Sequence, residues 1–178
     1  VLGSKVLASP LGPDELGRAI ELDDKNPEYR IQTGQMVAVM SKERLEIPLD
    51  MCSNSFGIRS DFTKKGLHCF GGPHLDPGWK GHLIVSLQNV GPEPIALRMD
   101  VPFFTVTFER LEQKAKKGYE GSRQNQDDFP ADQYQFILSA RTTSLAEIPT
   151  LRVQVARLTA VIQELEEREK TYQWEISK

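Results

Sequence analysis

The first two thirds of the chain consist of short apolar runs separated by turn residues. This pattern restricts the fold more than any other feature of the sequence. Glycine and proline stand in many of the gaps between the runs, and 103–112 alternates apolar with polar residues as a half-buried strand does. Many short strands at close spacing are typical of sandwiches and barrels. The sequence therefore predicts a mainly β domain over residues 1–112.

The character of the chain changes after residue 112. Residues 113–143 are polar and poor in aliphatic side chains, and basic residues gather within them at 114–123. A segment of this composition buries little apolar surface and is typical of a surface loop. We predict that residues 113–143 form a loop or a mobile flap.

Residues 144–178 carry a heptad repeat, in which apolar side chains recur at alternating steps of three and four. Ser144 and Glu147 have the spacing of a capping box, so we predict a helix over 144–178 that self-associates as a coiled coil. The alternative is an amphipathic helix that lies on its own domain. β-Branched residues at a and leucine at d favour two parallel strands, whereas Val161 at g leaves room for three. Such a helix also offers a surface to a protein partner.

Composition excludes several classes of function. The net charge of −3 gives no overall basic field for nucleic acid, and no apolar run approaches the ~20 residues that cross a bilayer. Cys52 and Cys69 are too few for a disulfide framework and are expected as thiols in the cytoplasm. The chain starts at Val1 without a visible signal peptide, so we expect a fragment or a trimmed chain. These features predict a cytoplasmic protein that binds neither nucleic acid nor membrane.

Cationic and hydroxyl side chains cluster in "GIRSDFTKKGL", residues 57–67. Arg59, Ser60 and Lys64 lie close together directly after a predicted strand, with Asp61 among them. Guanidinium and ammonium groups neutralise phosphate oxygens, so one interpretation is a phosphate site. The other is a turn with solvated charges, which the local sequence favours.

A second candidate site is "HLDPGWKG", residues 74–81. Asp76 before Pro-Gly is a good turn former, which is the plainer interpretation. The functional interpretation is that a rigidly held carboxylate binds a sugar hydroxyl or a water while Trp79 packs on a ribose or a base. A metal site is not predicted, because the spacing of the nearby histidines, cysteine and aspartate fits no zinc pattern.

Together the two segments resemble the superfamily of dCTP deaminases and dUTPases, and the deaminase branch most closely. In that superfamily a G-R-S-S-L-A-R-L-G-L segment is followed by I-D-P-G-W-x-G, then by a Gly-Pro turn and a closing strand. The resemblance covers about residues 1–125. The matching positions are Arg59-Ser60, Gly66-Leu67, Asp76-Pro77-Gly78-Trp79, Gly81, Asn89 and "GPEPIALR".

The resemblance implies a distorted antiparallel β-barrel of the dUTPase type that assembles as a homotrimer, with nucleotide sites between subunits. The Arg-Ser segment of one subunit would face the triphosphate of a deoxynucleotide, and the Asp-to-Trp turn of a neighbour would hold the sugar and base. Mg²⁺ would accompany the triphosphate if the protein is active. The nucleotide-binding positions that the resemblance implies are Arg59, Ser60, Asp61, Lys64, Asp76, Trp79 and Tyr119, the last in a Y-x-G flap.

This chain departs from the family at positions that carry the chemistry. The deaminase uses a glutamate after the D-P-G-W turn to move protons, and that position is Ser86, whose hydroxyl does not titrate near neutral pH. Asp61 replaces a serine beside the triphosphate, where a carboxylate repels phosphate. Lys64 replaces an arginine and loses the bidentate fork, and Thr105 stands where the family has a glutamine.

Two functions remain open from the sequence. The first is a nucleotide-binding trimer with degraded catalysis that acts in sensing or assembly. The second is an active deaminase or dUTPase, a hydrolase of dUTP biosynthesis, because Asp76 matches the aspartate with which dUTPases order the attacking water. The candidate catalytic positions are Ser60, Asp76 and Ser86.

Overall fold

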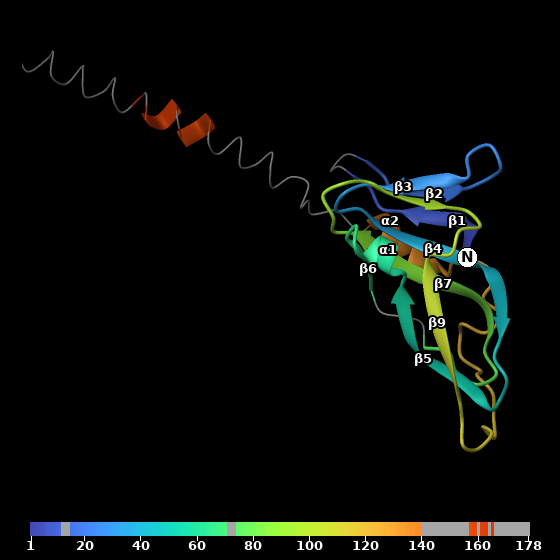
Figure 1. Cartoon of the computed structure of the whole chain (residues 1–178). Coiled ribbons are helices and arrows are strands. Elements are labelled where there is room, and N and C mark those ends of the chain that lie inside the picture. Colours follow the sequence, from blue (N-terminus) through green and yellow to red (C-terminus); the bar gives the residue numbers. More distant parts are fainter. Residues whose placement is uncertain (12–14, 71–73, 140–156, 160, 164, 166–178) are drawn as a thin grey trace, which may run out of the picture. The chain divides into compact units, whose positions relative to one another are not determined.

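A computed structural model describes residues 1–11, 15–70, 74–139, 157–159, 161–163 and 165 (Figure 1). The chain divides into two compact units, Val1–Thr142 and Thr143–Lys178, and each is considered by itself. The elements described in the first unit are β1 (Leu2–Ala8), β2 (Arg18–Glu21), β3 (Glu28–Ile31), β4 (Met36–Glu46), β5 (Met51–Ile58), α1 (Ser60–Thr63), β6 (Leu67–Cys69), β7 (Lys80–Asn89), β8 (Ile95–Arg98), β9 (Phe104–Arg110) and α2 (Ala131–Ser139).

The strands form antiparallel ladders, which confirms the prediction of a mainly β domain. Five of them make one sheet in the order β2-β1-β4-β7-β6, while β3 pairs with β8 and β5 with β9. A closed barrel requires every edge strand to be paired, but β2 and β6 end the large sheet. Among the described strands the ladders therefore do not close into the predicted barrel. An isolated bridge between Ser53 and Leu75 links β5 to the turn before β7.

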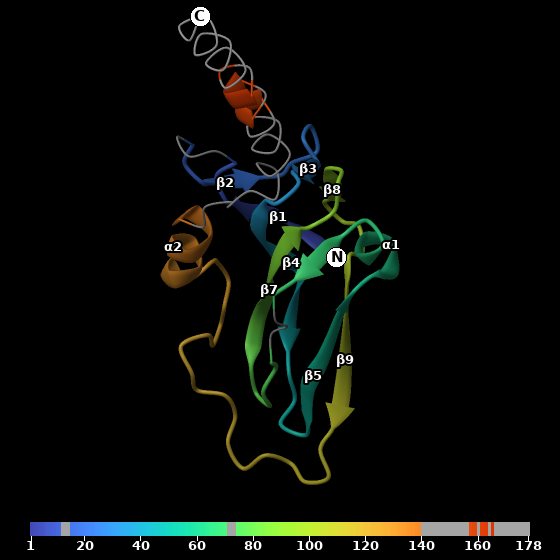
Figure 2. The ribbon, with the colours of Figure 1, turned by 90° about the vertical axis from the view of Figure 1, so that its left-hand side faces the viewer.

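The core is organised by the long central strands β4 and β7. Along β7, buried residues alternate with half-buried ones from Lys80 to Asn89, so one face of the strand points into the core. On that side Val39 and Val85 pack with Leu97 of β8 in the main apolar cluster. On the opposite side of β4, Ala38 and Met40 pack against Phe129 and Ile137. Both faces of the sheet are thus covered, the second by α2 and the chain that leads to it (Figure 2).

Three local predictions differ from the structure. The segment 113–143, predicted as a loop, contains α2, which begins after Pro130 and buries Ile137. Its remaining residues are mostly polar or exposed, so composition gave little sign of a helix. β2 was missed because it is short and largely exposed at the sheet edge. The short helix α1, which follows β5, was not predicted from the sequence.

In the second unit, residues 157–159, 161–163 and 165 are helical. Leu158, Ile162 and Leu165 from the predicted heptad are 62%, 55% and 56% exposed. The capping box at Ser144 and the other heptad positions lie outside the described residues. Within the part of the chain that is described, no helix has the length and apolar character needed to cross a membrane.

Candidate functional site

A cavity of about 300 Å³ lies beside the turn that precedes β7. Side chains from the turn, from β7, from the segment after β9 and from α2 meet around it. Asp76 and Trp79 come from the turn and Tyr119 from the following segment, so the structure brings three of the predicted site residues together. The full lining is His74, Leu75, Asp76, Trp79, Leu83, Ile84, Tyr119, Arg123, Gln126, Pro130 and Gln133.

The turn itself is fixed by its backbone. The N–H of Trp79 donates to the carbonyl of Asp76 at 3.1 Å, and the N–H of Gly78 donates to Ile47 at 2.9 Å. Gly78 has a φ of +82°, a conformation that costs a side-chain-bearing residue strain. A Cβ at Gly78 would lie 2.6 Å from the Cα of Gly118, so the turn and the next segment touch through two glycines.

Asp76 and Trp79 differ in how accessible they are. The Asp76 carboxylate is 41% exposed and lies 2.9 Å from Nε2 of His74. Trp79 is only 5% exposed, packs with Leu75 and Leu83, and donates its indole N–H to the carbonyl of Arg123 at 2.8 Å. Asp76 is therefore available to a ligand, while Trp79 forms a fixed apolar wall.

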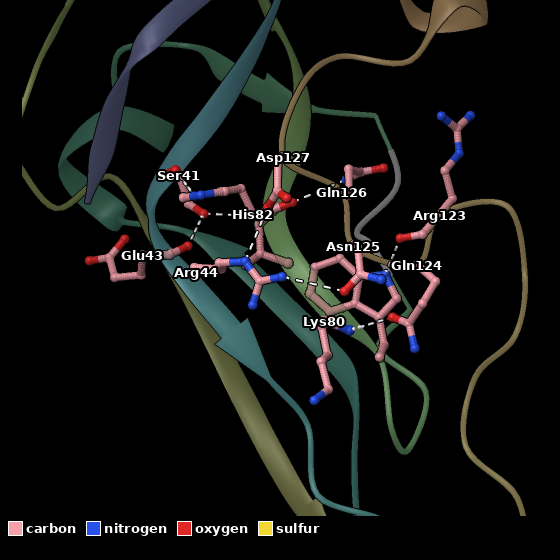
Figure 3. A network of polar contacts seen from close by, with 12 residues as sticks. Ser41, Glu43, Arg44, Lys80, His82, Arg123, Gln124, Asn125, Gln126 and Asp127 are labelled. Carbon is pink, nitrogen blue, oxygen red and sulfur yellow. Dashed lines mark hydrogen bonds and ion pairs between the residues drawn. The ribbon is translucent and has the colours of Figure 1, made fainter.

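Residues 118–127 lie within the predicted flap of 113–143, and from here on the name flap is kept for 118–127 alone. This segment is tied to the turn and to β7 by polar contacts (Figure 3). The side chain of Gln124 accepts from the Lys80 N–H at 2.8 Å and donates to the carbonyls of Gly78 and Tyr119 at 2.9 Å. Gln126 pairs with Gly81 in a parallel bridge and receives the His82 N–H at 2.8 Å. These bonds use backbone groups of the turn and of β7, so the flap is held without any ligand.

Arg123 is a positively charged residue of the flap that lines the cavity. Its guanidinium lies 2.5 Å from the carboxylate of Asp132 in α2. The hydrogen bond from Arg123 holds the pKa of Asp132 below its usual value. The backbone N–H of Arg123 donates to the hydroxyl of Tyr119 at 3.3 Å, which positions the phenol at the cavity.

Ser86 lies on the half-buried face of β7, two residues beyond the cavity-lining Ile84. It is paired across the ladder with Ala38. Its hydroxyl accepts a hydrogen bond of 2.8 Å from the side-chain amide of Gln133 in α2. Gln133 lines the cavity, whereas Ser86 is not among its lining residues.

Of the residues predicted near the phosphates, Arg59, Ser60 and Thr105 line a second cavity, of about 430 Å³, and Asp61 does not. Arg59 lies between β5 and α1, α1 supplies Ser60 and β9 supplies Thr105. Arg59 Nε lies 3.3 Å from the carboxylate of Asp61, and both side chains are about half exposed, at 50% and 56%. Lys64 is exposed and is not part of the lining.

The predicted site residues thus fall into two groups within one chain. Arg59 and Ser60 line one cavity, Asp76, Trp79 and Tyr119 line the other, and the two linings share no residue. Arg123, Gln126 and Gln133 were not predicted from the sequence. The only signal for them was the amide-rich stretch after Tyr119. Over the described residues, no three His, Cys, Asp or Glu side chains gather closely enough to hold a metal ion.

Comparison with known proteins identifies the family. A family model described as dCTP deaminase-like matches residues 7–111, which include both Arg59-Ser60 and the Asp76 turn. The chain belongs to the dCTP deaminase-like family. This also confirms the resemblance that the two sequence segments suggested.

Curated relatives support the same assignment. The dCTP deaminase of Pyrococcus furiosus is 31% identical over 109 residues, which are 61% of this chain and 67% of that protein. The dCTP deaminase of Thermococcus gammatolerans is 36% identical over 87 residues, 48% of this chain and 54% of the relative. The "dCTP deaminase, dUMP-forming" of Methanopyrus kandleri is 31% identical over 98 residues, 54% of this chain and 50% of the relative. The matched part therefore spans between half and two thirds of these proteins.

The contact between the turn and the flap gives a first testable prediction. Gly78→Ala places a Cβ against Gly118 and forces a side chain into a positive φ, so we expect it to destabilise the fold by about 1–3 kcal/mol. Gly57→Ala is the control, because a Cβ there meets nothing within 4 Å. Urea unfolding at equal protein concentration measures both. Equal stability of the two variants would contradict the close contact.

Proposed function

We propose that this protein binds a pyrimidine deoxynucleotide but has lost the deaminase reaction, and that it acts as a nucleotide sensor or an assembly protein. The observation that carries the proposal is the hydrogen bond between Ser86 and Gln133. The resemblance places the deaminase's proton-transferring glutamate at position 86. Here that position holds a hydroxyl bonded to an amide, and neither group titrates near neutral pH.

The residues that line the first cavity support the proposal that the protein binds a nucleotide. Asp76 and Tyr119 line a cavity with apolar walls and a few convergent polar groups, which is the usual make-up of a small-molecule site. The flap, which contributes Tyr119, Arg123 and Gln126 to the lining, is held by backbone hydrogen bonds. A protein of this kind can keep affinity for a nucleotide after its chemistry has been lost.

The alternative is an active dUTPase or a deaminase with a rerouted proton path. Asp76 favours it, because its carboxylate is accessible and lies 2.9 Å from the imidazole of His74. An acid in this position can order an attacking water. Mg²⁺ would then arrive with the triphosphate. In either case we propose the cytoplasm as the location, where thiols such as those of Cys52 and Cys69 persist.

An assay of the purified protein separates the two functions. With dCTP or dUTP and magnesium we expect release of neither ammonia nor pyrophosphate. We also expect dCTP or dUTP, or the corresponding deoxynucleosides, to raise the melting temperature of the protein. A ligand that binds only the folded state stabilises that state. Turnover would establish the enzyme, and the absence of any melting shift would refute the binding function.

A substitution at position 86 tests whether one residue accounts for the lost reaction. Ser86→Glu places a carboxylate within reach of the Gln133 amide, and we expect it to restore measurable ammonia release from a bound cytosine nucleotide. Ser86→Gln has the same shape without a titratable proton and is the matched control. If Ser86→Glu binds the nucleotide yet releases no ammonia, inactivation by a single residue is wrong.

We further propose that the protein assembles as a homotrimer. The phosphate-facing and the base-facing residues line separate cavities in one chain, so a complete site needs one wall from each of two subunits. The exposed Leu158, Ile162 and Leu165 offer an apolar surface to further copies or to a protein partner. The first unit, Val1–Thr142, is expected to set the number of subunits, since it is the larger of the two units.

The mass in solution tests this assembly. We expect three copies of the 20.1 kDa chain, and three copies again after removal of residues 144–178, because the sites lie in the first unit. Light scattering coupled to size exclusion provides the measurement. A full-length dimer that becomes a monomer on truncation would instead assign assembly to the helix alone.

A further inference from the structure

Two glutamine amides line the first cavity, and they differ in what holds them. Gln126 donates from Nε2 to the backbone carbonyl of His82 at 3.1 Å. A carbonyl only accepts hydrogen bonds, so this bond fixes which end of the Gln126 amide points toward β7. Gln133 donates from Nε2 to the hydroxyl of Ser86 at 2.8 Å. A hydroxyl both donates and accepts, so it does not fix the orientation of the Gln133 amide.

The Gln133 amide therefore has two arrangements that keep its contact with Ser86. In the first, the amide nitrogen donates to the hydroxyl and the amide oxygen is left for a ligand. In the second, the hydroxyl donates to the amide oxygen and the NH2 group is left instead. Among the residues that the structure describes, Gln133 makes no other side-chain hydrogen bond that would select one of the two.

Cytosine and uracil differ in polarity at the edge that carries C4. Cytosine has an amino group there, which donates, whereas uracil has a carbonyl, which accepts. A protein group that only accepts or only donates favours one of these bases. An amide that can turn over suits both, because its oxygen accepts from the cytosine amino group and its NH2 group donates to the uracil carbonyl.

The Ser86–Gln133 pair stands where the C4 edge of a bound base is expected. The resemblance to the deaminases places their proton-transferring glutamate at position 86, and the proton transfer serves the removal of the amino group. Ile84 lies two residues earlier on the same face of β7 and lines the cavity together with Gln133. Ser86 is outside the lining, so Gln133 is the member of the pair that a base would contact.

We infer that Gln133 reads the C4 edge of the base without distinguishing an amino group from a carbonyl, so that cytosine and uracil deoxynucleotides bind with similar affinity. Ser86 is the positioning residue, because its hydroxyl permits both arrangements of the amide. An ionised carboxylate at position 86 would only accept, and it would hold the amide oxygen toward the base, which selects cytosine. The inference rests on the proposed binding function and adds which bases the site accepts.

Titration calorimetry on the full chain with dCTP and dUTP, with magnesium present, tests the inference through the ratio of the two dissociation constants. We expect the unaltered chain to bind both within about threefold, since each forms one neutral hydrogen bond with the amide. Gln133→Glu only accepts when ionised at about pH 8, so it should favour dCTP by about tenfold. Gln135→Glu adds the same charge at an exposed position of α2 outside the lining, and it is the matched control.

A second pair of variants tests the positioning role of Ser86. Ser86→Asp only accepts at about pH 8 and should also shift the ratio toward dCTP, whereas Ser86→Thr keeps a hydroxyl and should leave the ratio unchanged. Because Ser86 does not line the cavity, its effect must pass through Gln133. The shift caused by Ser86→Asp should therefore vanish in a chain that also carries Gln133→Leu.

The outcomes separate this inference from the function on which it rests. A preference of the unaltered chain for one nucleotide by more than about tenfold would overturn the inference and leave the binding function intact. An unchanged ratio in Gln133→Glu, or an equal shift in Gln135→Glu, would overturn it as well. A shift by Ser86→Asp that persists with Gln133→Leu would contradict the positioning role. Failure of both nucleotides to bind the unaltered chain would refute the binding function itself.

Discussion

The pairing of β4 with β7 is the constraint on which the rest of the structure depends. It is a long antiparallel ladder, interrupted by one irregularity between Met40 and Arg44. One face of this pair carries the main core, the opposite face packs against α2, and the flap pairs with the start of β7. The turn that holds Asp76 leads directly into β7, so the geometry of the cavity follows from the register of this one ladder.

The sequence predicted those strands that show a clear pattern of apolar and polar residues within a short stretch. β9 was found because apolar and polar residues alternate over 103–112. α2 and β2 were not, because a helix that buries mainly Ile137 and a short exposed strand have weak patterns. Which strands pair is decided by contacts far apart in the chain, so the sequence could not show that β5 pairs with β9.

The site shows the same division. Family motifs identified Asp76, Trp79 and Tyr119, and these line one cavity. Motifs could not show that the Trp79 ring is buried, or that Gln133 reaches across to Ser86, because both depend on how the flap and α2 pack. The family's fold and the family's reaction therefore depend on different residues in this chain. The D-P-G-W turn keeps the local fold of the site, while the residue at position 86 affects the reaction.

Two of the contacts between the turn and the flap bracket one wall of the cavity. Gly78 meets Gly118, and Gly81 pairs with Gln126. Between these two points the turn advances by three residues (81 − 78) and the flap by eight (126 − 118). Because both ends are joined, the flap carries more chain than the turn between them, and Tyr119 and Arg123 on this longer segment line the cavity. The additional residues of the flap thus supply side chains to the cavity wall, so an insertion or deletion between Gly118 and Gln126 would change the lining of the cavity.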